Sequence, residues 1–252
     1  MKRRQFIQVA GAGFVAGALP SVLPEVARSQ SGGVAIQYLG HMCFLFTGGG
    51  RRILVNPFRS AGCTAGYRAP KVAADLVMIS SQLLDEGAVD VVPGNPKLLV
   101  EAGSYDINGF KVQGIGTDHD RVGGKRFGRN VAWRWTQGGL NLVHLGGTAA
   151  PISLEQKILI GRPDVVFLPV GGGAKAYNPQ EAKQALDVLN AKIVVPMYYR
   201  TSAAKGECDI GGLDAFLSVM TGNPVRKGGS SMSLGKGDLP GSGSVIQVMT
   251  YA

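Results

Sequence analysis

Histidine and cysteine are scarce in this chain, which has 3 of each among its 252 residues. Zinc sites are built mainly from imidazole and thiolate ligands, so this scarcity limits the metal chemistry that the chain can support. Cys43, Cys63 and Cys208 form no C-x-x-C pair, and we expect no cysteine-based metal site. Because their number is odd, at least one thiol is unpaired or bonds to another chain.

Long hydrophobic runs are also missing from the body of the protein. No apolar stretch after the N-terminal segment reaches the ~18 residues of a spanning helix, so we expect no transmembrane segment in the mature chain. The formal net charge of +9 favours anionic partners in a general way. The basic residues are scattered, however, without interleaved aromatics or a helix-turn-helix pattern, and we expect no nucleic-acid partner.

Residues 1–30 have the layout of an export signal. Adjacent Arg3 and Arg4 precede a moderately apolar stretch from Ile7 to Leu23, which is typical of a twin-arginine signal. This predicts export to a periplasm or, in a cyanobacterium, to a thylakoid lumen. Residues 31–252 contain no internal repeat and no long linker, so we expect a single domain there.

Strand signals dominate the first half of that domain. VAIQYLG, CFLFT and RRILVNP are short apolar runs, and DLVMIS is apolar almost throughout, as in a strand covered on both faces. Asn108-Gly109 and Gly138-Gly139 lie between alternating runs and predict β-hairpins. Strands then alternate with helices, two of which have N-cap signals at Ser153 and Asn178. The pattern indicates two mixed sheets with helices outside.

The C-terminal part carries weaker signals. LDAFLSVM predicts a final short helix. The Gly/Ser-rich segment 228–244 fits either a flexible flap over a pocket or a long surface loop.

The succession YLGHMCFLF, RILVNPF, ADLVMIS, GTDHD, LVHLGG, VVFLPVGGG and IVVPMYY resembles the metallo-β-lactamase fold. The similarity runs from about Val34 to Thr201. It is strongest to the metal-dependent hydrolases that include the ascorbate-6-phosphate lactonase-like proteins. The resemblance implies an α/β (α+β) fold, namely a four-layer αββα sandwich of two mixed β-sheets. It also implies a dinuclear metal site at the edge where the sheets meet.

The metal ligands of that family are mostly replaced in this chain. The family uses H-x-H-x-D-H after a buried strand, and then a His, an Asp and a His in later loops. The resemblance places these positions on Ser81, Leu83, Asp85, Glu86, His119, Gly147 and Tyr198. Asp85 and His119 alone match the family pattern.

We interpret this pattern as a site that has lost its metals, and we predict no cofactor. A catalytic zinc keeps three protein ligands, and the bound ion is what lowers the pKa of water from ~15.7 to ~7. The chain would then be an exported protein that binds a small anion or a partner protein, rather than an enzyme. The alternative is a hydrolase of a lactone, phosphodiester or amide, with one weakly held divalent metal such as Zn or Mn on Asp85, Glu86 and His119.

Further polar residues lie near the expected pocket. His41 matches a histidine common at the pocket mouth in the subgroup, and a structural and a functional role are equally open for it. We expect His144 to be a hydrogen-bonded core residue. The loop DHDRVGGKRFGRN resembles a family loop that could bind an anion, and a solvated loop kept for its glycine turns is the other interpretation. Its basic residues are Arg121, Lys125, Arg126 and Arg129.

Overall fold

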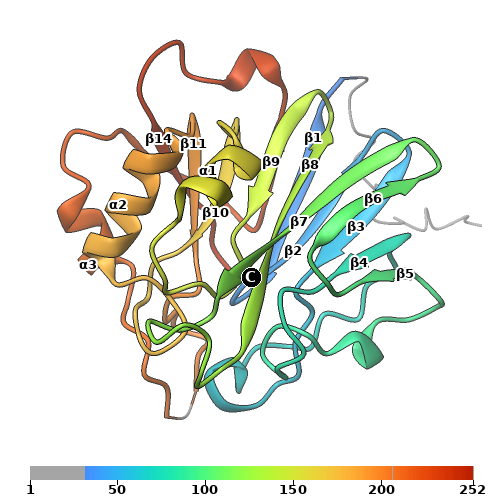
Figure 1. Cartoon of the computed structure of the whole chain (residues 1–252), viewed down its shortest axis with the longest axis horizontal. Helices are drawn as coiled ribbons and strands as arrows, with labels where there is room; N and C mark the ends of the chain where they lie inside the picture. The colour runs from blue at the N-terminus through green and yellow to red at the C-terminus, as the bar shows by residue number, and fades with distance from the viewer. Residues whose placement is uncertain (1–31, 206, 252) are drawn as a thin grey trace, which may run out of the picture.

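Two β-sheets packed face to face form the centre of the molecule (Figure 1). The computed structural model describes residues 32–205 and 207–251. The six-stranded sheet contains, in spatial order, β13 (Ser231–Leu234), β1 (Val34–Gly40), β2 (Cys43–Gly48), β3 (Arg51–Val55), β4 (Leu76–Met78) and β5 (Lys97–Leu99). The eight-stranded sheet contains β12 (Val225–Lys227), β14 (Val245–Val248), β11 (Ile193–Met197), β10 (Val165–Pro169), β9 (Leu140–His144), β8 (Arg129–Gln137), β7 (Phe110–Asp118) and β6 (Gly103–Ile107).

Both sheets are mixed, as predicted. The hairpin-connected strands β1 to β3 and β6 to β9 run antiparallel. Parallel pairs join β3 to β4 and β4 to β5 in one sheet, and β9, β10, β11, β14 and β12 in the other. Parallel strands end at the same edge of a sheet, so the loops that follow them gather there.

Local sequence signals account for most of the turns and helix ends. Asn108 and Gly109 have φ of 53° and 79°, as a type I′ turn requires, and join β6 to β7. Helix α1 (Leu154–Ile160) starts at the capping box of Ser153, and α2 (Pro179–Leu189) starts at that of Asn178. The predicted last helix is α3 (Asp214–Val219). These predictions are confirmed.

The core is divided into three apolar layers. Phe44 and Phe46 of one sheet meet Trp135 and Phe167 of the other in the central layer. The second layer lies between the eight-stranded sheet and the helices, which cover its outer face (Figure 1). The third layer lies on the outer face of the six-stranded sheet, where loops and two short 3-10 turns, Gly62–Thr64 and Val89–Val91, take the place of long helices. The fold is therefore the expected sandwich of two mixed sheets, with few helices.

The Gly/Ser-rich segment is neither wholly a flap nor wholly a loop. It contains β13, which pairs with β1 through Val34–Leu234 and Gln37–Ser231 and forms an edge of the six-stranded sheet. The sequence SMSL is short and half polar, which fits an edge strand with one exposed face but gives a weak strand signal. Strands β12 and β14 were also absent from the prediction.

Two further predictions concern the export signal and membrane-spanning helices. The predicted export signal, residues 1–30, lies outside the described residues. Within the described ranges, none of the helices has the length and apolar character that a membrane crossing demands.

Candidate functional site

The predicted ligand positions converge at one edge of the sandwich, beyond the carboxyl ends of several strands. The turn 81–86 follows β4, His119 follows β7, and Gly147 follows β9. Tyr198 comes directly after β11, and His41 lies in the tight turn between β1 and β2. The strands therefore bring the loops that carry these residues to the same edge of the sandwich.

Glu86 and His119 form the inner half of the site. Their side chains are 0% exposed, and Glu86 Oε1 contacts His119 Nε2 directly. The hydroxyl of Ser81 donates a second hydrogen bond to Glu86 Oε1, at 2.6 Å. Burial alone would lower the pKa of His119, but the charge and hydrogen bond of Glu86 outweigh it and raise that pKa above its ordinary value. The pair is thus a buried imidazole–carboxylate contact in which Glu86 favours the protonated form of the ring.

Gly147 is the residue that the sequence resemblance aligns with a bridging aspartate, and here the position has no room for a side chain. A Cβ atom on Gly147 would lie 2.4 Å from His119 Cε1 and 3.2 Å from Glu86 Oε2. Real Cβ atoms essentially never show contacts below 3.0 Å, so an aspartate would require the His119 ring to move. The replacement by glycine and the Glu86–His119 contact are therefore parts of one arrangement.

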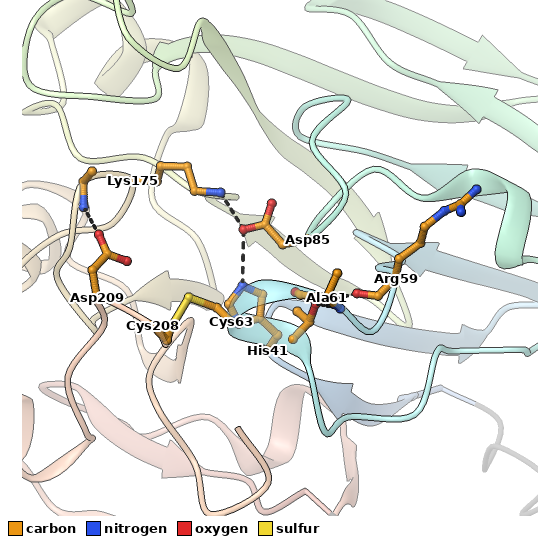
Figure 2. The surroundings of a disulfide bond; sticks show 10 residues. His41, Arg59, Ala61, Cys63, Asp85, Lys175, Cys208 and Asp209 are labelled. Atoms are coloured by element: carbon orange, nitrogen blue, oxygen red, sulfur yellow. Dashed lines mark hydrogen bonds and ion pairs between the residues drawn. A yellow bond between two sulfur atoms is a disulfide. The ribbon is translucent and has the colours of Figure 1, made fainter. Parts of the chain in front are cut away.

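Asp85 belongs to the outer half of the site and is paired with a lysine. Lys175 Nζ lies 2.5 Å from Asp85 Oδ2, and the two side chains are 16% and 17% exposed. His41 Nε2 lies 3.9 Å from the same oxygen (Figure 2), which is too long for a hydrogen bond. Burial alone would raise the pKa of Asp85, but His41 and Lys175 together hold it well below its ordinary value.

Tyr198 closes this outer half from the side of β11. Its ring is buried and meets the His41 ring edge-on, with 4.4 Å between the centroids. Burial, followed by the charges of Asp85 and Glu86, raises the pKa of Tyr198 well above its ordinary value. A phenol held in its neutral form is a poor substitute for the histidine that the family has at this position.

Lys175 was not found from the sequence, and neither was the way its loop is held. Asp209 Oδ2 accepts a hydrogen bond from the backbone N–H of Ala174 at 3.1 Å. The neighbouring Cys208 forms a disulfide with Cys63, 145 residues earlier in the chain (Figure 2). Cys43 is the buried, free cysteine. A lysine in the Gly-rich stretch GGGAKAYNP carries no motif, and three cysteines allow three pairings.

The remaining donors do not fit the family's dinuclear metal. Glu86 and His119 are bound to each other, and the ammonium of Lys175 occupies Asp85. Within residues 32–205 and 207–251, one group of three potential ligands lies with its atoms inside 4.8 Å, and it consists of Cys63, Cys208 and Asp209. Two of those three atoms are the bonded sulfurs of the disulfide. A metal at Asp85 Oδ2, Glu86 Oε1 or His119 Nε2 would have to displace the partner that each of these atoms already has.

The loop for which anion binding and a solvated glycine-turn role were both open is held by contacts of its own residues. Arg121 forms a two-pronged ion pair with Glu181 at 2.6 and 2.7 Å, so it is not available as an anion ligand. The conformation of the loop is fixed by Asp120, whose carboxylate accepts hydrogen bonds from several backbone N–H groups of the loop, each at 2.9 Å. Lys125 and Arg126 are exposed. The cleft described in the next paragraph is not lined by Arg121, Lys125 or Arg126.

Arg129 differs from the other three basic residues because it lines a cleft. The cleft has a volume of about 660 Å³ and lies beside the turn 81–83, between β5 and the start of β8. Its polar wall is formed by Ser81, Gln82, Glu101 and Arg129, and Leu83 supplies an apolar part. Arg129 also pairs with Asp118 at 2.5 Å, but 65% of its side chain stays exposed. The cleft is thus a place beside the site where a small molecule can lie.

The other two histidines have different surroundings. His144 is buried, its Nε2 bonds to the carbonyl of Met42 at 3.0 Å, and its Nδ1 accepts from Gly146 N–H. Burial lowers its pKa to about 4, so it is the neutral core histidine that the sequence predicted. His41 is also fully buried, yet neither ring nitrogen has a hydrogen-bond partner among the described residues.

Comparison with known proteins agrees with this architecture. A family model described as a beta-lactamase superfamily domain matches residues 35–198. A UPF0173 metal-dependent hydrolase from Thermococcus onnurineus is 26% identical over 193 residues, covering 67% of this chain and 85% of the relative. Another from Thermus thermophilus is 28% identical over 202 residues, covering 67% and 84%.

A solved structure extends the similarity beyond the family model. A proposed zinc-dependent hydrolase of the metallo-beta-lactamase superfamily from Thermotoga maritima superposes with a TM-score of 0.70 at 29% identity, covering 86% of this chain and 98% of that one. With the two mixed sheets and the site at their edge, these matches show that the chain belongs to the beta-lactamase superfamily and has the metallo-β-lactamase fold.

Proposed function

We propose that this chain is an exported, non-hydrolytic member of the superfamily, which binds a ligand through its own side chains and without a metal. The observation that carries the proposal is the state of the two carboxylates in the former metal-binding turn. Asp85 is paired with Lys175, and Glu86 is paired with His119. Each carboxylate therefore already has a cationic partner supplied by the protein.

Electrostatics explains why these pairs oppose metal binding. A divalent ion at Asp85 would lie beside the Lys175 ammonium and would be repelled by it. An ion at His119 Nε2 would have to displace Glu86, and an ion at either ring nitrogen would need the imidazole in its neutral form. Glu86 opposes that form because it raises the pKa of His119. Without the ion, water at this site keeps its ordinary pKa, and no hydroxide nucleophile forms.

The ligand that fits the surroundings is a small molecule with an anionic group. The cleft of about 660 Å³ beside Ser81 is large enough for such a molecule and is lined by Arg129. Guanidinium groups bind carboxylate and phosphate through two parallel hydrogen bonds. Glu101 on the same wall would repel a second negative group and accept a donor instead.

Export is supported by the cysteine chemistry. Disulfides persist in oxidising compartments and are rare in reducing ones, and Cys63 and Cys208 form one here. The twin-arginine pattern at the start of the sequence predicts the same destination outside the cytoplasm.

Metal analysis tests the proposal directly. The protein is purified without chelator, beside the Thermotoga maritima relative as a positive control, and its zinc, manganese and iron are measured. We expect far less than one equivalent per chain, and no turnover of lactone, phosphodiester or amide substrates. About two equivalents per chain, or metal-dependent turnover, would reject the proposal.

Ligand binding is tested separately by thermal shift with phosphate and with small mono- and dicarboxylates. We expect stabilisation by at least one of them, and we expect it to disappear in Arg129→Gln. The matched control is Arg126→Gln, which removes an exposed arginine of the same loop outside the cleft. Equal responses of the two variants would show that the cleft is not the binding site.

The second candidate function is a hydrolase with one metal at an altered site. The relatives are named metal-dependent hydrolases. Among the described residues, four buried atoms in the site also have no hydrogen-bond partner, namely both His41 nitrogens, Glu86 Oε2 and His119 Nδ1. This function predicts metal-dependent turnover that disappears in Asp85→Ala and in His119→Ala.

A further inference from the structure

Each carboxylate of the site already has a nitrogen partner from the protein. Asp85 pairs with the ammonium of Lys175, and Glu86 contacts the imidazole of His119. These four groups come from three different loops, which follow β4, β7 and β10. In a metal-containing member of the family, the metal pair would neutralise the carboxylates and hold the loops together. Without metals, groups of the protein itself have to neutralise the carboxylates and join the loops.

Lys175 is held in place more firmly than a surface lysine. The backbone on both sides of it is fixed by Arg121, which donates to the carbonyls of Gly173 at 2.8 Å and Ala176 at 2.9 Å. Asp209 fixes the same loop through the N–H of Ala174. The basic residue that the sequence suggested as an anion ligand therefore positions the loop that carries Lys175.

The ammonium itself lies in a partly closed environment. Its Nζ is 5.9 Å from the centroid of the Tyr198 ring and 6.0 Å from that of Phe127. Aromatic faces attract cations at such distances, and 16% exposure of the side chain limits screening by water. Tyr198 stands at a former ligand position, so Lys175 Nζ lies between two positions, 85 and 198, that would otherwise face a metal.

We propose that Lys175 is a built-in cation that takes over the charge-neutralising and loop-joining role of the metal at Asp85. This inference deepens the proposed function and rests on it, because it names the group that replaces the metal. An ordinary exposed ion pair, by contrast, contributes little and couples weakly to its surroundings. The two cases differ in what removal of the lysine should do.

The test combines a double-mutant cycle with metal rescue. Lys175→Met, Asp85→Asn and the double variant are compared by thermal unfolding in chelator-treated protein. We expect Lys175→Met to lower Tm by roughly 5 °C or more, because Asp85 is left without its counter-charge. The double variant should recover at least half of that loss. Lys183→Met is the matched control, since it removes an exposed lysine paired with Asp187 at 3.0 Å, and it should leave Tm nearly unchanged.

Metal rescue supplies a readout that a merely structural lysine would not move. Added Zn²⁺ or Mn²⁺ should raise the Tm of Lys175→Met, with at least about tenfold tighter binding than to the wild type, which corresponds to ~1.4 kcal/mol. The double variant should show no such gain, because it lacks the carboxylate. Equal metal binding by wild type and Lys175→Met, or equal Tm losses in Lys175→Met and the double variant, would overturn the inference.

The outcomes separate this inference from the proposed function. Wild-type protein that carries stoichiometric metal contradicts the proposed function and, with it, the inference. A metal-free wild type in which Lys175 and Asp85 do not couple contradicts the inference alone. If Lys175→Met fails to accumulate while the double variant folds, the coupling is demonstrated. If both fail to fold, the loss does not depend on Asp85, and the inference is wrong.

Discussion

The inner and outer halves of the site each pair a carboxylate with a nitrogen group, but in different surroundings. Glu86 and His119 are 0% exposed and sit against Gly147, at the ends of the strands. Asp85 and Lys175 are partly exposed, and the loop that carries Lys175 is tied to the disulfide through Asp209. A carboxylate is neutralised by a cation in both halves, but the inner pair depends on the sheet framework and the outer pair on loops.

This difference indicates which interactions can be removed without loss of the fold. Removing one partner of a buried pair leaves an uncompensated charge in a low dielectric, which is costly. Removing one partner of the Lys175–Asp85 pair, whose side chains are 16% and 17% exposed, leaves a charge that water reaches only in part, so we expect a smaller but still measurable cost. Substitutions in one half, with stability and hydrogen exchange measured in both, show whether the two halves are independent.

The largest effect is expected from His119→Ala. It leaves Glu86 buried and without its cation, so we expect a loss of about 3–5 kcal/mol in the free energy of unfolding. Urea titration by fluorescence measures this. Glu86→Gln combined with His119→Asn removes both charges and should cost less than His119→Ala. A loss below about 1 kcal/mol for His119→Ala would show that the pair is not ionic.

An intermediate effect is expected from breaking the disulfide. The bond between Cys63 and Cys208 closes a loop across 145 residues, and removing such a bond typically costs about 2–4 kcal/mol. Thermal unfolding of Cys63→Ser/Cys208→Ser against wild type measures the cost. Hydrogen exchange should accelerate at the N–H of Ala174, near the outer half, and stay slow at Val131, whose N–H bonds to Ser80 O at 2.8 Å within the framework. Equal acceleration at both amides would mean that the two halves are not independent.

The smallest effect is expected from pH, with opposite directions for the two halves. The pKa of His119 is raised in the folded protein, so its pair contributes fully below the unfolded value of ~6.5 and is lost as pH rises through the raised folded value. The pKa of Asp85 is lowered, so its pair contributes above the unfolded value of ~3.9 and is lost as pH falls below it. We expect His119→Asn to flatten the alkaline side of the stability profile and Asp85→Asn the acidic side. The same change in both variants would contradict the assignment.

Most of the fold could be predicted from local patterns. The hairpins depend on Asn108-Gly109 and Gly138-Gly139, whose positive φ angles suit glycine and asparagine. The helix starts depend on Ser153 and Asn178, and the caps they form are those that the sequence predicts. Strand β13 could not be predicted because its pairing with β1 brings together segments far apart in sequence, and SMSL itself has little strand propensity.

The sequence predicted where the candidate site lies in the fold, but not which of its side chains pair with one another. The resemblance to the family assigned positions 81, 83, 85, 86, 119, 147 and 198 to loops after recognisable strands, and those loops lie at the carboxyl ends of the strands in the structure. The ion pair of Arg121 was not predicted, because Glu181 on α2 lies within reach of it only in the folded chain. The partner of Asp85 was missed for the same reason, since Lys175 lies 90 residues away.

The sequence by itself determined the strand and turn framework, the scarcity of imidazole and thiolate ligands, and the glycine and tyrosine at positions that the resemblance assigns to metal ligands. These are properties of residue type and of short-range spacing. The tertiary structure alone decided which charges neutralise one another, which cysteines pair, and that the His119 ring leaves no space beside Gly147. Such contacts join residues from separate loops, and their energies depend on distance and burial, which no local pattern encodes.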